Sequence, residues 1–125
     1  MAHNVTQHGF KVSYAATGNN ISGNDIYDSS VGFSINGNNN RIEYNNVSRC
    51  SSGYEVEGAA NTTLEGNLAW NISSQGYWTL GGAAADSFIN NTARNTTIGF
   101  DISGSGNRLS SNTAYENSGY GATGF

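Results

Sequence analysis

The stretch Asn40-Arg-Ile-Glu-Tyr-Asn-Asn-Val-Ser-Arg-Cys-Ser-Ser-Gly-Tyr-Glu-Val is one unit of a repeat that runs through all 125 residues of the chain. The clearest mark of the repeat is a glycine followed directly by an aromatic residue, as in Gly53-Tyr54. Six such pairs recur at intervals of 23, 21, 23, 23 and 20 residues: Gly9-Phe10, Gly32-Phe33, Gly53-Tyr54, Gly76-Tyr77, Gly99-Phe100 and Gly119-Tyr120. A seventh pair, Gly124-Phe125, stands outside this spacing. A recurrence this regular indicates one structural unit repeated about five and a half times.

Three short apolar positions recur in each unit. The first is an aromatic and an aliphatic residue two apart, which face one side of a strand while the residue between them faces the other. Its members are Phe10/Val12, Phe33/Ile35, Tyr54/Val56, Phe100/Ile102 and, less cleanly, Tyr77 with Thr79 or Leu80, where we expect an extra residue within residues 76–80. The second comprises Ile21, Ile42, Leu64, Phe88 and Leu109, and the third Ile26, Val47, Ala69, Ala93 and Ala114. One asparagine separates these two positions in each unit: Asn24, Asn45, Asn67, Asn91 and Asn112.

These positions predict three short strands per unit, joined by tight turns into a coil. A coil buries its inward side chains only by stacking on its neighbours, so the strands become parallel ladders about 4.8 Å apart. The aromatics of the six pairs should then form an internal column. We expect the asparagines at a bend, where they adopt the left-handed backbone conformation and their stacked amides hydrogen-bond from coil to coil.

The sequence therefore predicts an all-β fold, a right-handed parallel β-helix with about five to six coils of about 22 residues and three short strands per coil. Residues 1–125 would form a single repeat domain. An antiparallel sandwich also has turn signals at intervals of about 8 to 12 residues, but it has no reason to repeat this longer pattern. Leucine-rich repeats have a similar length, yet their Leu-x-x-Leu-x-Leu framework is absent.

Composition narrows the range of partners. The chain contains 19 Asn, 16 Ser and 17 Gly but no Pro, and its formal net charge of −4 comes from scattered acidic and basic residues. Nucleic acids and anionic membranes are bound by a clustered basic face, so we expect neither partner. The sequence has no apolar run of about eighteen residues, so we expect no membrane span. Cys50 is the single cysteine, and we expect a buried structural thiol.

Residues 40–56 and the unit Asn107-Arg-Leu-Ser-Ser-Asn-Thr-Ala-Tyr-Glu-Asn-Ser-Gly-Tyr resemble the right-handed parallel β-helix repeats of the pectate-lyase-like superfamily. More narrowly, they are similar to the NosD-like and "carbohydrate-binding and sugar hydrolysis" repeats of bacterial and archaeal surface proteins. The resemblance covers essentially the whole chain. It implies an extracellular or cell-surface location and a polysaccharide or cell-surface glycan as partner, and on its own it would allow calcium as a cofactor. The fold alone does not identify an activity.

A NosD-like protein would handle copper through His, Met or Cys ligands. This chain offers Met1, His3, His8 and Cys50. We expect the two histidines to belong to a terminal strand or a tag-like segment, so the sequence predicts no metal site and no other cofactor.

One group of outward residues is a candidate sugar site. Glu55, Trp78 and Asp101 each lie between the aromatic and the aliphatic residue of the first strand, and Glu57 lies two residues beyond Glu55. A sugar ring could stack on the indole while the acids bind its hydroxyls or act as acid and base. Glu55, Glu57 and Asp101 are therefore also weak candidates for catalytic residues. The alternative interpretation is a solvated strand face with scattered acids.

A second outward column follows the third apolar position and contains Tyr27, Trp70, Arg94 and Tyr115, with Ser48 between the first two. Planar groups spaced along a sheet suit an extended glycan, since each offers a face to a sugar ring. Aromatic residues also favour strand surfaces without any ligand. This column is thus the alternative carbohydrate-binding site.

Neither end of the repeat carries a recognisable cap, and exposed terminal coils would present unpaired strand edges. The chain is then either a fragment or an uncapped module. We expect a non-catalytic extracellular module that binds polysaccharide or forms part of a cell-surface structure. Two alternatives remain: a structural unit that stacks head to tail into fibres or arrays, and a polysaccharide lyase, epimerase or hydrolase. Whether the chain is an enzyme is left open, and the missing enzymatic signatures of the fold favour the non-catalytic interpretation.

Overall fold

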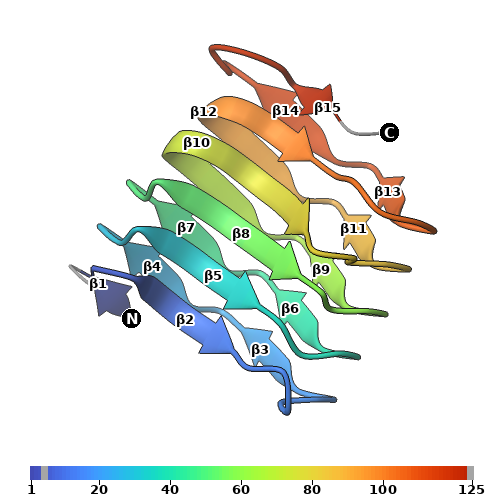
Figure 1. Ribbon diagram of the computed structural model, residues 1–125. Coiled ribbons are helices and arrows are strands. Elements are labelled where there is room, and N and C mark those ends of the chain that lie inside the picture. Colours follow the sequence, from blue (N-terminus) through green and yellow to red (C-terminus); the bar gives the residue numbers. More distant parts are fainter. Residues whose placement is uncertain (4–5, 124–125) are drawn as a thin grey trace.

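The chain winds as a right-handed parallel β-helix of about five coils, as the computed structural model shows for residues 1–3 and 6–123 (Figure 1). No helix occurs among these described residues. Each coil contributes to three ladders of parallel strands, and the ladders run along the solenoid from the N-terminal to the C-terminal coil. The fold class expected from the repeat is confirmed.

The three ladders are defined by their strands. The first ladder contains β2 (His8–Val12), β5 (Val31–Ile35), β8 (Ser52–Glu57), the second halves of β10 (Leu68–Leu80) and β12 (Thr92–Asp101), and β15 (Ala122–Thr123). The second ladder contains β3 (Asn20–Ser22), β6 (Arg41–Glu43), β9 (Thr63–Glu65), β11 (Ser87–Ile89) and β13 (Arg108–Ser110). The third ladder contains β1 (Ala2–His3), β4 (Asp25–Tyr27), β7 (Asn46–Ser48), the first halves of β10 and β12, and β14 (Thr113–Tyr115).

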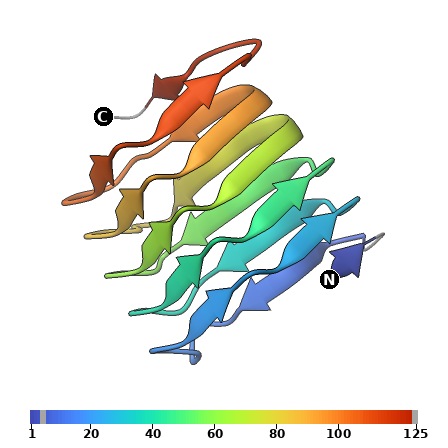
Figure 2. The ribbon, with the colours of Figure 1, turned by 180° about the vertical axis from the view of Figure 1, so that it is seen from behind.

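We number the coils from the first ladder onward, so that β2, β3 and β4 make the first coil and β8 opens the third. Figure 2 shows the second and third ladders from behind. In the third and fourth coils β10 and β12 continue through the bend from the third ladder into the first, which joins the two ladders into one sheet. The register between β10 and β12 shifts between Ile72 and Gln75, where β10 has one residue more than β12. The extra residue of this unit therefore lies before Gly76 and not within residues 76–80, where we expected it, since Tyr77 to Leu80 pair with β8 without a shift.

The aromatic residues form a stacked column inside the first ladder. The rings of Phe10, Phe33, Tyr54, Tyr77 and Phe100 follow one another with centroid distances of 5.2, 5.2, 4.8 and 4.7 Å. Glycine precedes each ring because the coils leave no room for a side chain there: a Cβ on Gly53 would lie 2.2 Å from the Gly76 carbonyl oxygen. The aliphatic partner of Tyr77 is replaced by Thr79, which pairs with Val56 and is buried, while Leu80 pairs with Glu57.

The expectation that Tyr120 joins this column is wrong. Phe100 pairs with Ala122, and the Tyr120 side chain is 66% exposed. The sixth pair follows the fifth after 20 residues, whereas Ala122 lies 22 residues after Phe100. Tyr120 therefore reaches the first ladder too early to occupy the inward position.

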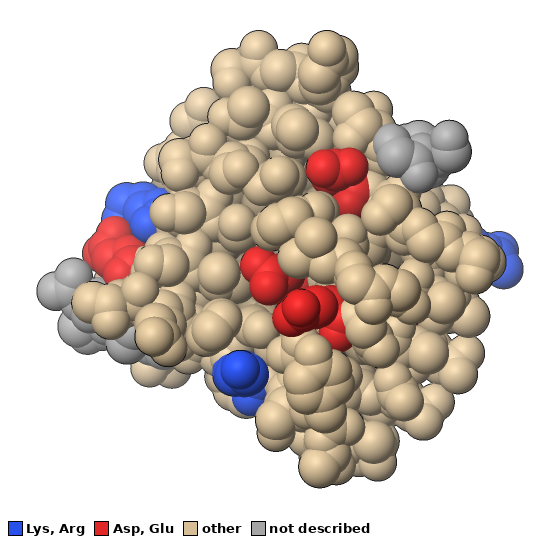
Figure 3. All heavy atoms as spheres, viewed as in Figure 1, with Lys and Arg blue, Asp and Glu red and all other residues tan. Residues whose placement is uncertain are grey.

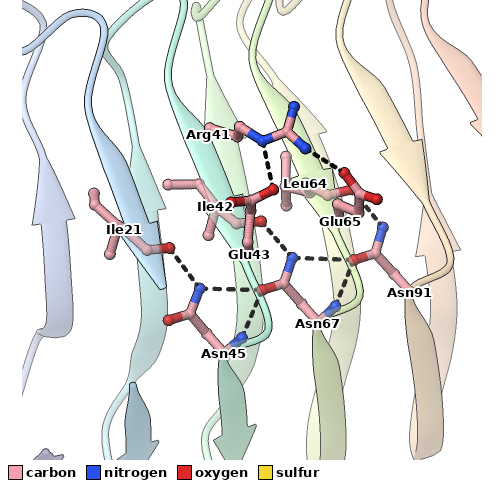
Figure 4. A network of polar contacts seen from close by, with 9 residues as sticks. All are labelled: Ile21, Arg41, Ile42, Glu43, Asn45, Leu64, Glu65, Asn67 and Asn91. Atoms are coloured by element: carbon pink, nitrogen blue, oxygen red, sulfur yellow. Dashed lines mark hydrogen bonds and ion pairs between the residues drawn. The ribbon is translucent and has the colours of Figure 1, made fainter. Parts of the chain in front are cut away.

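The expected asparagine ladder stands at the bend between the second and third ladders (Figure 4). In each step, the backbone N–H and the Nδ2 of one asparagine donate to Oδ1 of the next; for Asn45 and Asn67 these distances are 2.9 and 3.1 Å. The Nδ2 of Asn67 also donates to the Ile42 carbonyl at 2.7 Å. The same pattern repeats at Asn91 and Asn112. Both polar atoms of each internal amide are thus satisfied between coils.

These asparagines do not adopt the left-handed backbone conformation, contrary to our expectation. The residue before each of them does so instead, for example Tyr44 with a φ of 52° before Asn45. In each coil three left-handed residues recur five apart: Gly18, Gly23 and Asp28; Asn39, Tyr44 and Arg49; Asn61, Gly66 and Asn71; Ala85, Asn90 and Asn95; Gly106, Ser111 and Glu116. Gly58, Gly81, Gly82 and Gly104 are further left-handed residues between the first and second ladders. A left-handed residue of this series therefore stands at each bend, directly before an inward side chain.

We predict that Asn67→Ala destabilises the fold by about 3 kcal/mol, because the two donors of Asn45 and the Ile42 carbonyl lose their partners in a buried environment. Urea unfolding followed by circular dichroism measures this change. Asn20→Ala removes an exposed asparagine of β3 and is the matched control, with an expected effect below about 0.5 kcal/mol. Equal, small effects of both substitutions would contradict a structural role for the amide ladder.

Candidate functional site

The outward face of the first ladder carries a continuous column of polar and aromatic side chains. Lys11, Ser34, Glu55, Trp78, Asp101 and Thr123 pair in this order from strand to strand. Because each rung rises by about 4.8 Å, Trp78 has Glu55 one rung below and Asp101 one rung above. The structure thus brings together three of the four residues of the first candidate sugar site. Figure 3 shows this face, with acidic side chains gathered near its middle and basic side chains below them and at the edges.

Glu57, the fourth residue, lies at the end of β8 beside Leu80 of β10. Its Oε2 accepts a hydrogen bond of 2.9 Å from Nδ2 of Asn36. Asn36 and Ser34 are almost fully buried although they belong to the outward face, and the Ser34 hydroxyl lies 3.3 Å from Oδ1 of Asn36. Next to Glu55, this face therefore carries buried polar side chains that bond to one another and not solvated ones. The repeat pattern did not indicate this burial.

The Trp78 indole is half-buried, and its N–H makes no hydrogen bond within the described part of the chain. Asp101 accepts a hydrogen bond of 2.9 Å from the Thr123 hydroxyl. The centre of this face hence offers an aromatic surface, an available N–H donor and two carboxylates on the neighbouring rungs. These are the groups that recognise a sugar ring and its hydroxyls.

The acids on this face influence one another. Burial raises the pKa of Glu55 above its ordinary value, and the neighbouring charge of Glu57 raises this pKa further. His8 and Lys11 act in the opposite direction. Since burial is the largest cause, the Glu55 carboxylate lies in a partly desolvated environment in which a ligand's hydrogen bonds would be stronger than in water.

The outward face of the third ladder brings the second candidate group together. Tyr27, Ser48, Trp70, Arg94 and Tyr115 pair from strand to strand in register. Here the polar groups are largely used within the protein: Nε1 of Trp70 donates to Oδ1 of Asn46 at 2.9 Å, and Arg94 forms an ion pair of 3.4 Å with Glu116. The Arg49 guanidinium lies 5.0 Å from the centroid of the Tyr27 ring and makes two hydrogen bonds with Asp28. This face is held together by its own contacts.

The second ladder carries a charged cluster that the sequence analysis did not single out. Arg41 of β6 bonds to Glu43 on the same strand and, at 2.7 Å, to Glu65 of β9 (Figure 4). The two glutamates pair in register on adjacent rungs, so the guanidinium between them offsets their repulsion. In the sequence, Arg41 stands two residues before the outward Glu43. Glu65 occupies the position of Glu43 in the next unit. This arrangement needs no ligand to explain it.

Two further findings concern metals and membranes. No group of three or more His, Cys, Asp or Glu side chains that could hold a metal ion occurs among the described residues. Within the same part of the chain, no helix is long and apolar enough to cross a membrane.

Comparison with known proteins identifies a family that this chain resembles. The model of a family described as "Periplasmic copper-binding protein (NosD)" matches residues 2–124. Searches of the curated proteins and of the solved structures give no match to the chain. The family match covers nearly the whole repeat array and agrees with the resemblance found in the sequence.

We predict that Glu57→Gln lowers the pKa of Glu55, because it removes the nearby negative charge while leaving Glu55 buried. The pKa of Glu55 should nevertheless stay above its ordinary value, since burial is the larger cause. A carbon-13 NMR titration of the glutamate carboxyl groups measures both effects. An unchanged pKa of Glu55 in the variant would show that the two carboxylates do not interact.

Proposed function

The chain belongs to the NosD family, and we propose that it is a non-catalytic β-helix repeat module of the cell envelope that binds a polysaccharide or cell-surface glycan on the outward face of the first ladder. The observation that carries this proposal is the half-buried Trp78 indole with an available N–H between Glu55 and Asp101. The family's description as periplasmic supports the location in the envelope.

The chemistry of the face suits a sugar. The apolar face of a pyranose ring stacks on an indole, and its hydroxyl groups donate to carboxylates and accept from the indole N–H. Carboxylates one rung away on either side can reach hydroxyls at both edges of a ring stacked on Trp78. The column continues to Lys11 below and to Thr123 above, so that an extended chain of sugars can lie along the ladder.

The arrangement of acids favours binding over hydrolysis. A glycosidase holds the scissile bond between two carboxyl groups at most about 9.5 Å apart. Glu55 and Asp101 are two rungs apart, about 10 Å along the ladder, and the Trp78 rung lies between them. Glu57 is nearer to Glu55 but is bonded to Asn36. Glu55, Glu57 and Asp101 therefore act in our proposal as ligand-binding groups.

The third ladder is the less suitable face for a glycan. The Trp70 N–H is bonded to Asn46, and the arginines of this face pair with acids of the protein itself. A sugar binding there would have to compete with these contacts, whereas the Trp78 N–H has none to lose. This difference is the reason for placing the site on the first ladder.

The described residues form no site for the copper named in the family's description. The Cys50 thiol is buried and bonds to the Ser48 carbonyl at 3.2 Å, and burial raises the pKa of this thiol, which disfavours the thiolate that binds metals. The Met1 sulfur accepts a hydrogen bond of 3.4 Å from the Tyr27 hydroxyl, and His8 lies in β2 beside Val31. Since the described residues contain no group of three or more His, Cys, Asp or Glu that could hold a metal ion, copper enters no step of the proposed function.

We predict that Trp78→Ala lowers the affinity for the glycan by about tenfold or more, because it removes the stacking surface and the N–H donor together. Trp70→Ala is the matched control, since it removes a half-buried indole from the other face, and it should retain wild-type binding. A glycan array identifies the ligand, and isothermal titration calorimetry then compares the affinities. Glu55→Gln and Asp101→Asn should each weaken binding without abolishing it.

Equal thermal stability of both variants, measured by circular dichroism, makes sure that lost binding is not lost folding. The reverse result, with binding lost only in Trp70→Ala, would move the site to the third ladder. Failure of the wild-type protein to bind any glycan on the array would contradict the proposed function.

A further inference from the structure

The bend between the first and second ladders contains a second inward polar column, which we call the first-bend column: Asn19, Asn40, Thr62, Asp86 and Asn107. Like the asparagine ladder, it links coils through backbone N–H groups, at three of its four steps. The Asn19 N–H donates to Oδ1 of Asn40 at 2.9 Å, the Thr62 N–H to Oδ1 of Asp86 at 2.8 Å, and the Asp86 N–H to Oδ1 of Asn107 at 2.9 Å. In this respect the carboxyl of Asp86 substitutes for an amide.

Nδ2 of Asn40 and the hydroxyl of Thr62 each donate to a backbone carbonyl. Nδ2 of Asn40 donates to the carbonyl of Ala16 at 2.8 Å, and the Thr62 hydroxyl donates to the carbonyl of Gly37 at 3.3 Å. In both cases the acceptor belongs to the preceding coil and lies three residues before the residue of the first-bend column in that coil. Ala16 stands three residues before Asn19, and Gly37 three residues before Asn40. The corresponding carbonyl for Asp86 is that of Ala59, three residues before Thr62. This carbonyl accepts a hydrogen bond of 3.1 Å from the Ala84 N–H, so a protonated Asp86 would supply its second donor.

Asp86 can fill this place only when it carries a proton. The side chain is fully buried, and its Oδ2 has no hydrogen-bond partner in the described part of the chain. A carboxylate has no donor to offer to a carbonyl, whereas a protonated carboxyl has one O–H. A buried carboxylate with one unsatisfied oxygen is a costly arrangement, and protonation removes both the charge and the missing donor.

No described charged group compensates the carboxylate. The column neighbours of Asp86 are Thr62 and Asn107, and the buried residues beside it on the bend, Ala59 and Ala83, are apolar. The charged residues on the packed elements are Glu57 of β8, Glu65 of β9 and Arg108 of β13, all at outward positions. Burial raises the pKa of Asp86 to about 6, and only the hydrogen bond from the Thr62 N–H acts against this rise.

We propose that Asp86 is a proton-operated latch between the third and fourth coils. In the protonated form, Oδ2–H donates to the carbonyl of the third coil and closes the bend in the way Asn40 closes the bend below it. Loss of this proton to solvent leaves a buried, unpaired charge, which is relieved when the bend around residues 81–88 opens to water. The bend begins with Gly81 and Gly82, whose positive φ values of 56° and 88° glycine adopts without steric cost.

The direction of the pH dependence follows from linkage. A carboxyl whose pKa is higher in the folded chain than in the unfolded chain makes the folded state bind protons more tightly. The stabilisation from Asp86 is therefore greatest below its ordinary pKa of 3.8, decreases as the pH rises to about 6, and stays constant above that value. The latch is closed in acid and weakened at neutral pH.

Hydrogen exchange of wild-type protein and of Asp86→Asn between pH 4 and pH 7.5 tests the latch, after correction for the intrinsic exchange rates. In the wild type, protection of the amides of residues 83–88 should fall with rising pH, by up to about a hundredfold for a pKa raised by two units. Asp86→Asn has a permanent Nδ2 donor, so its protection should not change with pH. The same variant should melt several degrees higher than the wild type at pH 7.5 and at nearly the same temperature at pH 4.

Asp25→Asn replaces an exposed aspartate on the outward side of β4 and should keep the wild-type pH dependence. The proposal is overturned if Asp86→Asn shows the same pH dependence as the wild type, or if NMR finds that the Asp86 carboxyl titrates near pH 4. A loss of protection that is uniform over all coils would also overturn it, because the latch acts on one bend. None of these measurements depends on glycan binding.

Discussion

The stacking of each coil on the next is the interaction on which every other feature of this structure depends. A single coil is too small to have a core of its own, so each inward side chain must fit a neighbour about 4.8 Å above it and another below it. Apolar residues meet this condition by size and shape, as the five stacked rings do. An inward polar residue must both donate and accept hydrogen bonds along the solenoid axis, because its neighbours lie in the coils above and below it. Asparagine satisfies this condition, because its amide accepts from the coil before and donates to the coil after.

The architecture could be predicted from the sequence because this stacking condition acts on residue type. Gly53 and Tyr54 recur as a pair since the coils exclude a Cβ at one position and bury a ring at the next. The left-handed positions could not be predicted in the same way. Tyr44, Arg49 and Glu116 occupy them beside Gly and Asn, because the stacked ladders impose the bend and an exposed side chain tolerates the conformation. The first-bend column could not be predicted from a repeated residue type, because Thr62 and Asp86 interrupt its asparagines.

The candidate site could be predicted only in part, since outward residues are under no stacking condition. Register placed Glu55, Trp78 and Asp101 on consecutive rungs, and that much follows from the repeat. The contacts of each side chain do not follow from it. Trp70 and Trp78 are both outward, half-buried indoles, yet only Trp70 has a neighbour, Asn46, within reach of its N–H. The choice between the two faces depends on that local difference, which lies in one side chain on the adjacent coil.

Asp86 shows how a repeat can contain a costly residue without losing its fold. Aspartate has the shape of asparagine and preserves the hydrogen bond from the Thr62 N–H, so the neighbouring coils keep their register. What changes is a single donor atom, and the change affects one interface between two coils. Because solenoid stability is a sum of nearest-neighbour terms, a weak interface lowers the free energy of local opening more than it affects distant coils. A buried acid in such a column therefore couples pH to one bend, whereas the same acid in a globular core would couple pH to the whole domain.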